Sequence, residues 1–327
     1  MGHSGRGSVG SAFVLTVGVD IGGTSIRAAV VDRDGQVLDA ARAPTPNSER
    51  ALDDAVVRAV RELAGRHRVE AVGLAVAGFL TVDRRTVQFA PHLAWVDAPV
   101  AQRLSERLGL PVILEHDANA ALWAEYRFGA AAGGSRNVVL IAIGTGIGAA
   151  LLLDGRLYRG SFGVAPELGH ITVKPGGRAC ACGKQGCWER YCSGSALAES
   201  ALEMLAADPA ESAILAREVA VDPGALTGRR VAAAAHDGDR LAQAVMARFA
   251  RSLGRGLAAV ADMYDPDLVV IAGGVSSSAP LYLDQAREQY ALTVTGAGHR
   301  PLARIRRAQL GESAGLIGAA ELARKGE

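Results

Sequence analysis

The chain has 327 residues, which is enough for two domains that each have a hydrophobic core. Hydrophobic residues make up 49% of the chain, charged residues make up 21%, and the formal net charge of +1 argues against binding to nucleic acid or to an anionic membrane surface. No apolar run has the length of a membrane span, and three of the four cysteines lie close together, which indicates a reducing compartment rather than a disulfide framework. We therefore expect a globular cytoplasmic protein.

Residues 1–12 are polar and rich in Gly and Ser, which predicts a disordered leader. Two β-rich segments follow at residues 13–19 and 25–31, and the turn between them reads Asp20-Ile21-Gly22-Gly23-Thr24. Its glycines would let backbone N–H groups approach phosphate oxygens, Thr24 would add a hydroxyl donor, and Asp20 could hold a water molecule of Mg²⁺. An ordinary glycine hairpin would have the same pattern, so this turn alone leaves both interpretations open.

The next segments lead to a candidate catalytic carboxylate. Residues 49–66 have helical periodicity, and the apolar run 70–77 predicts a buried strand that ends at Gly78. A loop with His92 precedes an expected helix at 100–108, and a further buried strand at 111–114 delivers Glu115-His116-Asp117-Ala118-Asn119 to the start of a helix. Asp117 could cap that helix, or it could accept a hydroxyl proton from a substrate.

A second glycine turn follows a linker at 129–134. Residues 137–143 and 148–153 are expected strands that flank Gly144-Thr145-Gly146, which repeats the strand–glycine–strand arrangement of the first turn. Two such hairpins, each at the beginning of a separate half of the chain, favour phosphate binding more strongly than one.

The densest group of potential ligands lies at 166–192. Glu167, Gly169 and His170 form a Glu-x-Gly-His box, and Trp188-Glu189 follows three cysteines spaced C-x-C-x4-C, namely Cys180, Cys182 and Cys187. His170 and the three thiols are the ligand set of a closed structural zinc site. The ion would bring Glu167, His170 and Glu189 together, so that each could bind a different sugar hydroxyl. The alternative is a set of inert buried cysteines with a core histidine.

The remainder of the chain is mostly helical. Residues 195–264 are rich in alanine, a strand at 268–271 ends in Gly273-Gly274, an edge strand is expected at 305–308, and a closing helix at 313–325. The paired glycines could belong to a plain strand-to-helix turn.

Glu-x-Gly-His followed by C-x-C-G-x-x-G-C-x-E resembles the signature of the ROK family of bacterial sugar kinases and sugar-responsive repressors, and the resemblance extends from about Val14 to the C-terminus. It implies an α/β fold of the ribonuclease H-like, actin–hexokinase superfamily, with two domains and an interdomain cleft. We expect a small N-terminal domain at 13–128 plus 313–327 and a large domain with the zinc loop at 129–312.

The resemblance also implies an activity, ATP-dependent phosphorylation of a hexose as by the glucokinases of the family, in glycolysis. Asp117 matches the catalytic base. The implied sugar-binding residues are Gly78 through its backbone, His92, His116, Asn119, Glu167, His170 and Glu189. The implied nucleotide and Mg²⁺ residues are Asp20, Gly22, Gly23, Thr24, Gly144, Thr145 and Gly146, with Gly273 and Gly274 at the adenosine. Structural Zn²⁺ would be held by His170, Cys180, Cys182 and Cys187.

Two residues depart from the family pattern. Family glucokinases carry Asn where this chain has His92 and His116, and an imidazole places its donor and acceptor differently from an amide. A kinase for another polyol, such as an amino sugar, fructose or a cyclitol, is therefore an alternative. A sugar-responsive regulator is a further alternative, although family repressors carry a helix-turn-helix domain where this chain has only a short leader. By analogy with the family, we expect a homodimer or homotetramer.

Overall fold

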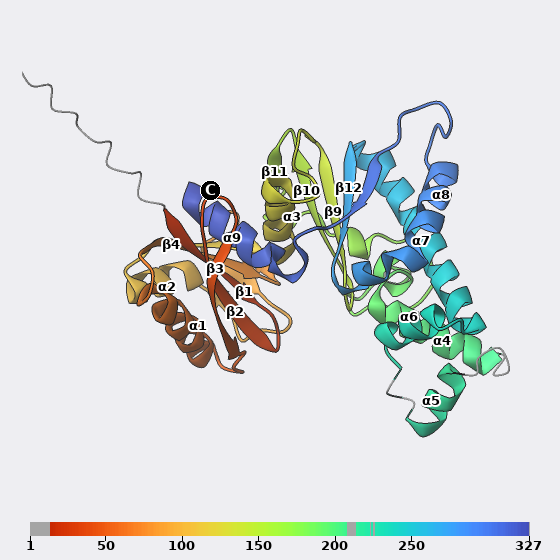
Figure 1. The fold of residues 1–327 in the computed structure, drawn as a ribbon, viewed down its shortest axis with the longest axis horizontal. Helices are drawn as coiled ribbons and strands as arrows, with labels where there is room; N and C mark the ends of the chain where they lie inside the picture. The colour runs from red at the N-terminus through yellow and green to blue at the C-terminus, as the bar shows by residue number, and fades with distance from the viewer. Residues whose placement is uncertain (1–13, 208–213, 223, 225, 327) are drawn as a thin grey trace, which may run out of the picture. The chain divides into compact units, whose positions relative to one another are not determined.

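The computed structural model describes residues 14–207, 214–222, 224 and 226–326, so the expected leader and the first residue of the expected first strand lie outside the described part. The chain divides into two compact units. The first comprises Met1–Ala120 and Gly315–Glu327, and the second comprises Ala121–Ala314. Figure 1 shows their helices and strands. Within the described residues, none of the helices combines the length and the apolar character that crossing a membrane requires.

The first unit contains a five-stranded sheet with the strand order β3-β2-β1-β4-β8. Strands β1 (Leu15–Ile21), β2 (Ser25–Val31) and β3 (Val37–Pro44) form an antiparallel meander. Strands β4 (Val69–Val76) and β8 (Val112–His116) run parallel to β1. These two strands and β1 are almost continuously apolar, as expected for strands that are covered on both faces.

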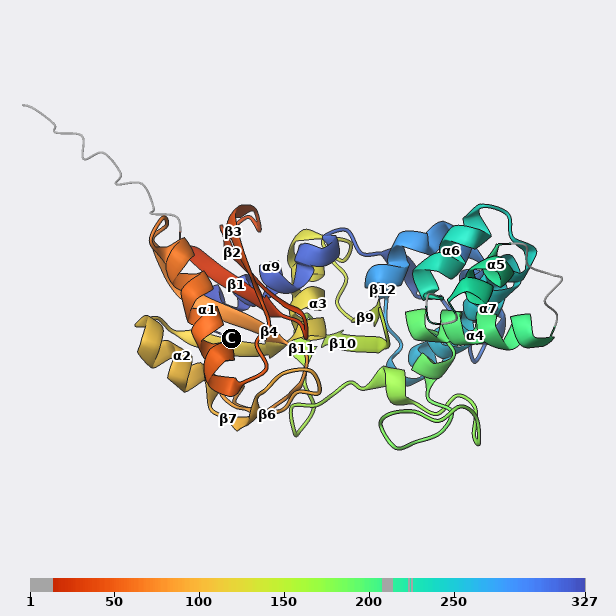
Figure 2. The ribbon, with the colours of Figure 1, turned by 90° about the horizontal axis from the view of Figure 1, so that it is seen from below.

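Helices cover both faces of this sheet. Helices α1 (Glu49–Ala64) and α2 (Val100–Leu108) lie on one face and α9 (Ala314–Lys325) on the other, as Figures 1 and 2 show. A side chain at Gly18 of β1 would overlap the backbone carbonyl of Leu316 in α9. The closing helix therefore lies directly against the strands, at a distance that only glycine permits.

A small three-stranded sheet in the first unit was not expected from the sequence. Strand β6 (Val87–Phe89) pairs with β5 (Phe79–Leu80) and β7 (Val96–Ala98), while residues 90–95 form the expected loop with His92. Strands of two or three residues are too short for an alternating pattern to become visible in the sequence. Gly78 immediately precedes β5, and His92 lies in the loop between β6 and β7.

The second unit contains another five-stranded sheet, with the order β11-β10-β9-β12-β13. Strands β9 (Val138–Ile143), β10 (Ile147–Leu153) and β11 (Arg156–Tyr158) are antiparallel neighbours. Strands β12 (Leu268–Ala272) and β13 (Arg304–Arg307) run parallel to β9. Both units thus combine a meander of three strands with two parallel strands.

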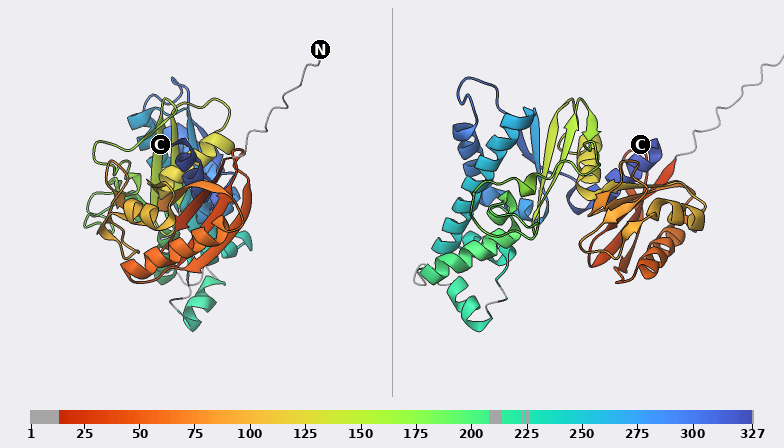
Figure 3. Two further views of the ribbon diagram at one scale, coloured as in Figure 1. Left: turned by 90° about the vertical axis from the view of Figure 1, so that its left-hand side faces the viewer. Right: turned by 180° about the vertical axis from the view of Figure 1, so that it is seen from behind.

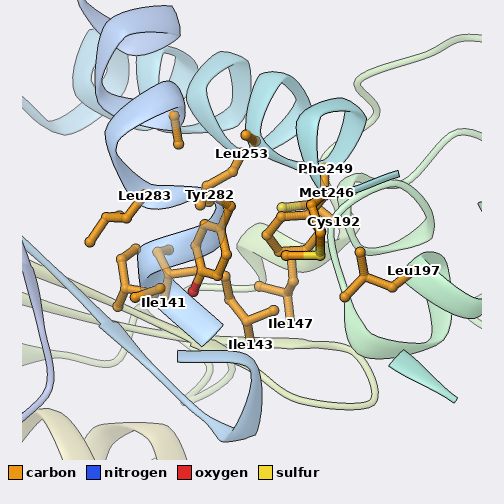
Figure 4. Packing of buried hydrophobic residues seen from close by; sticks show 14 of the residues in the cluster. Ile141, Ile143, Ile147, Cys192, Leu197, Met246, Phe249, Leu253, Tyr282 and Leu283 are labelled. Carbon is orange, nitrogen blue, oxygen red and sulfur yellow. The ribbon is translucent and has the colours of Figure 1, made fainter. Parts of the chain in front are cut away.

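In the part of the second unit that the structure describes, five α-helices follow residues 166–192 in sequence. They are α4 (Gly194–Ala207), α5 (Leu215–Val221), α6 (Gly228–His236), α7 (Arg240–Tyr264) and α8 (Leu283–Thr293). The right-hand view of Figure 3 shows α7 and α8 on one face of the sheet. In the core between them and the strands, the rings of Phe249 and Tyr282 meet edge to face with centroids 5.0 Å apart (Figure 4). Cys192 lies in the same core and is fully buried.

Helix α3 (Asp117–Phe128) contains the first boundary between the units. In its second half, the buried Glu125 carboxylate accepts hydrogen bonds from the backbone N–H groups of Ala130 at 2.7 Å, Gln309 at 2.9 Å and Leu310 at 2.8 Å. A side chain at Gly129 would overlap this carboxylate. Glu125 therefore joins the end of α3 to the segment that leads into α9.

Candidate functional site

Three predicted functional turns of the first unit lie at one edge of its sheet. Val76 of β4 pairs with Ile21 of β1 on one side and with His116 of β8 on the other. Because these strands are parallel, their carboxyl ends meet at the same edge. The first glycine hairpin, the Gly78 turn and Asp117 each directly follow one of these strand ends.

The first glycine hairpin is closed by its own backbone. The N–H of Gly22 donates to the Ser25 carbonyl at 3.0 Å, while Gly23 and Thr24 at the tip are exposed. Asp20, just before the turn, forms an ion pair with Arg27 of β2. The exposed tip leaves the backbone of Gly23 and Thr24 accessible to a phosphate group.

His92 lies against this hairpin. A Cβ atom placed on Gly23 would be 3.0 Å from His92 Cβ, so the loop that carries the histidine packs directly on the glycine backbone. The side chain of His92 is exposed. On the neighbouring turn, a Cβ at Gly78 would come within 2.7 Å of the Phe89 carbonyl oxygen, which leaves room only for glycine.

Asp117 is the first residue of α3, and 44% of its side chain is exposed. Its Oδ1 accepts a hydrogen bond from the N–H of Ala118 at 2.7 Å and lies 3.4 Å from Nε2 of His116. The carboxylate is thus held by its own turn and remains accessible, as a general base must be.

Asn119, for which the resemblance implies contact with the sugar, lies in the first turn of α3. Its side chain is buried, with 3% of the residue exposed, and its Nδ2 donates to Oε1 of Glu115 at 2.9 Å. The hydrogen bond connects the end of β8 to the first turn of α3. Burial at this point depends on tertiary packing and has no signature in the local sequence.

The second glycine hairpin lies between β9 and β10. The N–H of Gly144 donates to the Gly146 carbonyl at 2.9 Å, Thr145 at the tip is exposed, and the Gly144 carbonyl accepts from the N–H of Gly194 at 2.7 Å. Glu189 reaches this hairpin, because its Oε2 accepts from the N–H of Ile147 at 3.3 Å. Glu189, which is predicted to bind the sugar, is therefore in contact with the hairpin that is predicted to bind phosphate.

A further glycine turn of the second unit follows β12. Gly273 has a left-handed φ of 81°, and a Cβ there would overlap the Ile143 carbonyl at the end of β9. Gly274 begins a short 3-10 segment, η5 (Gly274–Leu281). The turn that is predicted to bind adenosine and the hairpin that is predicted to bind phosphate thus follow adjacent parallel strands of the second unit.

Four predicted zinc ligands converge in the loop after β11. One potential ligand atom from each of His170, Cys180, Cys182 and Cys187 lies within 4.8 Å of all the others. Cys180 Sγ is 3.6 Å from His170 Nδ1, and Cys182 Sγ is 3.6 Å from Cys187 Sγ. Tetrahedral ligands at ~2.0–2.3 Å from zinc lie roughly 3.3–3.8 Å from one another, so the donor types and these spacings fit the ion.

The loop backbone explains why the thiols converge. Gly183 and Gly186 both have left-handed φ values, of 88° and 76°, and the Cys180 N–H donates to the Lys184 carbonyl at 2.9 Å. Burial, together with a hydrogen bond to Glu189, raises the pKa of the Cys180 thiol to about 12. A metal ion would have to displace this proton, because only the thiolate is a ligand.

The predicted sugar-binding group of the second unit surrounds the cluster. Glu189 Oε1 lies 3.7 Å from His170 Nδ1, and Glu167 Oε2 lies 3.9 Å from His170 Nε2. The imidazole is thus placed between two carboxylates. Metal-bound imidazoles normally form a hydrogen bond through their other nitrogen, which would leave His170 Nε2 available for a hydroxyl group.

Two residues next to the Asp117 turn, Glu115 and Arg84, were not predicted to have a function. Glu115 is 1% exposed and bonds to Asn119, and Arg84 reaches it from a distant turn. An acid within an otherwise apolar strand was a signal for Glu115, since buried charges are rare without a partner. Arg84 has no comparable signal in the sequence.

Two α/β units of matching strand arrangement, each with a glycine turn inside its antiparallel hairpin, define a protein of the actin–hexokinase class. A model of the ROK family matches residues 16–326, and the chain belongs to this family. The predicted family and the predicted α/β fold class are therefore confirmed.

Three comparisons specify the similarity. The chain is 43% identical over 311 residues to a glucokinase of Streptomyces coelicolor, covering 95% of this chain and 98% of that protein. It is 32% identical over 320 residues to an N-acetylmannosamine kinase of Escherichia coli O127:H6, covering 95% and 98%. A ROK family glucokinase from Streptomyces griseus, solved in complex with glucose and AMPPNP, matches with a TM-score of 0.83 and 43% identity, covering 95% and 99%.

Proposed function

We propose that the protein is a glucokinase, which transfers the γ-phosphoryl group of ATP to the primary hydroxyl of glucose. The accessible Asp117 carboxylate, at the same sheet edge as the first phosphate hairpin, is the observation that carries this activity. The similarity to glucokinases over 95% of the chain supports the choice of sugar.

In this mechanism Asp117 acts as the general base. The sugar hydroxyl gives its proton to the Asp117 carboxylate while its oxygen forms a bond to the γ-phosphorus of ATP. The bond from that phosphorus to the bridging oxygen breaks, and ADP leaves. Phosphoryl transfer depends mainly on positioning and charge neutralisation, so most of the remaining groups are binding groups.

The two glycine hairpins would bind phosphates through exposed backbone N–H groups and the hydroxyls of Thr24 and Thr145. Gly273 and Gly274 would let the adenosine lie against the backbone. Mg²⁺ would neutralise phosphate charge, and Asp20 would hold one of its water molecules. The contact between His92 and Gly23 places this histidine beside the phosphate hairpin as well as in the expected sugar-binding loop.

Several of the predicted residues would orient the sugar. Glu167, His170 and Glu189 would each bind a different hydroxyl group, together with His116 and the Gly78 backbone. Asn119 would act indirectly, because it is buried against Glu115. We further propose that the cluster of His170 and three cysteines holds a structural zinc ion that keeps this group of side chains in place.

A coupled ADP-release assay with Mg-ATP tests this function, using glucose, mannose, fructose, N-acetylated hexosamines and a cyclitol. We expect glucose to be turned over with the highest kcat/KM, and Asp117→Asn to lower kcat by roughly 10²–10⁴-fold. Glucose binding to the variant, measured by calorimetry, should persist. An Asp117→Asn variant with wild-type turnover would remove this residue as the base, and no turnover of any member of the panel would contradict the kinase activity.

A kinase for an amino sugar or another polyol is the second candidate. It is supported by His92 and His116, which replace asparagines of the family pattern, and by the similarity to an N-acetylmannosamine kinase. Preferred turnover of any other panel member would establish it. The expected cytoplasmic location and the expected dimer or tetramer stay predictions.

A further inference from the structure

The turn that carries Asp117 rests on a buried carboxylate. Glu115 precedes Asp117 by two residues, and 2% of its side chain is exposed. Its Oε1 accepts from the backbone N–H of His116 at 3.1 Å and from Nδ2 of Asn119 at 2.9 Å. One oxygen thus joins the last residue of β8 to the first turn of α3, on either side of Asp117.

The other oxygen of Glu115 faces an arginine from a separate element. Arg84 Nη1 lies 3.4 Å from Glu115 Oε2, although 31 residues separate the two in sequence. Arg84 belongs to the turn between β5 and β6, and 22% of its side chain is exposed. A buried carboxylate needs such a partner, because an unpaired charge in this environment is strongly unfavourable.

The turn that holds Arg84 is itself well defined. Arg84 has a left-handed φ of 56°, and its N–H donates to the Thr81 carbonyl at 2.8 Å. The Thr81 hydroxyl donates to Asp83 at 2.6 Å and accepts from the N–H of Thr86 at 3.1 Å. A non-glycine residue in this region is unfavourable by ~1–2 kcal/mol, and these hydrogen bonds keep it there.

We propose that Arg84 and Glu115 are positioning residues for the phosphoryl transfer, which act by holding the turn of Asp117; this rests on the proposed function. Arg84 orients Glu115, and Glu115 orients the His116 backbone and the Asn119 side chain. The Asn119 amide has its Nδ2 directed at Glu115, and its buried Oδ1 has no hydrogen-bond partner within the described part of the chain. Glu115 therefore determines the orientation of Asn119.

The test compares Arg84→Met, Glu115→Gln and the double variant with Arg85→Met as the matched control. Arg85 is the adjacent residue of the same turn and is exposed. The first measurement is hydrogen–deuterium exchange of a peptide that spans residues 112–122 in the full-length protein. The second is steady-state kinetics with glucose and ATP, which separates kcat from KM. Arg84→Lys, which retains the charge, is the conservative variant, and Glu115→Gln carries the test alone if Arg84→Met does not fold.

We expect Arg84→Met and Glu115→Gln to raise exchange in this peptide and to lower kcat by roughly 10–100-fold, as displacements of about 1 Å do at active sites. KM for ATP should change less than threefold, and the double variant should lose no more than the worse single variant. Arg85→Met should match the wild type in both measurements, and Arg84→Lys should recover part of kcat.

Unchanged exchange in Arg84→Met would overturn the proposal whatever the activity. Raised exchange with unchanged kcat would also overturn it, because the pair would then be structural only. The same holds for additive losses in the double variant or an equal loss in Arg85→Met. A wild-type protein without glucose turnover would instead contradict the glucokinase function, while the exchange measurement would still show whether Arg84 holds the turn.

Discussion

At the scale of single residues, Gly146 shows how closely a residue that is predicted to bind phosphate packs against Glu189, which is predicted to bind the sugar. A side chain at this position would overlap Oε2 of Glu189, which at present accepts a hydrogen bond from the N–H of Ile147 at 3.3 Å. Gly144, two residues earlier in the same hairpin, has open space where a Cβ would be. A side chain at Gly146 would therefore displace the end of the Glu189 side chain.

We predict that Gly146→Ala weakens glucose binding, because the new methyl group displaces the Glu189 carboxylate. The Kd for glucose, measured by calorimetry without nucleotide, should rise at least about tenfold, or ~1.4 kcal/mol. Gly144→Ala is the control for glucose affinity, since its methyl group meets no neighbour within 4 Å. Equal glucose affinity of the Gly146→Ala variant and the wild type would exclude Glu189 as a hydroxyl ligand.

At the scale of elements, the segment that contains His170 and the three clustered cysteines has little regular structure of its own. Between β11 and α4 the structure contains only two 3-10 turns, η1 (Leu168–His170) and η2 (Trp188–Arg190), among the described residues. Its end is anchored by the buried Trp188, whose Nε1 donates to the Ser252 carbonyl of α7 at 3.1 Å. Backbone hydrogen bonds from Val173 to Gly186 and from Gly186 to Arg178 hold the middle of the segment, and an ion bound by the four potential ligands would add a further cross-link.

We predict one zinc ion per chain, and that its removal weakens sugar binding. Cys187→Ala should lose the metal, measured by elemental analysis, and should raise the Kd for glucose severalfold because Glu167, His170 and Glu189 are no longer held together. Cys192→Ala is the matched control: burial raises the pKa of this thiol well above its usual range, and it lies in the core rather than in the cluster. Full zinc content in the Cys187→Ala protein would rule out this ligand set.

At the scale of the whole molecule, two separate hydrophobic cores support the two units. One core joins β1, β2 and β4 to α1 and α2, and the other joins β9 and β12 to α4, α7 and α8. Leu74 belongs to the first and Leu253 to the second, and both side chains are fully buried. Cores of this kind can unfold as separate cooperative units.

We predict that calorimetry resolves two unfolding transitions, each of which responds to a different mutation. Leu74→Ala and Leu253→Ala should each destabilise one transition by about 2–5 kcal/mol, the usual cost of a large-to-small substitution in a core. The control is Glu288→Gln, at an exposed position of α8, which should shift neither transition. A single transition that both leucine variants lower equally would contradict independent cores.

Much of the architecture could be predicted from periodicity and glycine placement. The expected strand at 25–31 and the expected helix at 100–108 coincide with β2 and α2, because long apolar runs and a regular helical pattern are strong local signals. The short strands β5, β6 and β7 were missed, since two or three residues carry no periodicity. The spacing of His170 and the three cysteines predicted a cluster that the structure also contains.

The sequence by itself determined the chemistry available to this protein: the two glycine turns, the accessible acid after β8 and the His and Cys ligand set are all local patterns. Only the tertiary structure decided which groups are buried and which distant residues meet. Asn119 is buried against Glu115, and Arg84 lies 31 residues away from the carboxylate that it meets. Burial and long-range ion pairs arise from packing between elements, and such contacts leave no trace in the order of neighbouring residues.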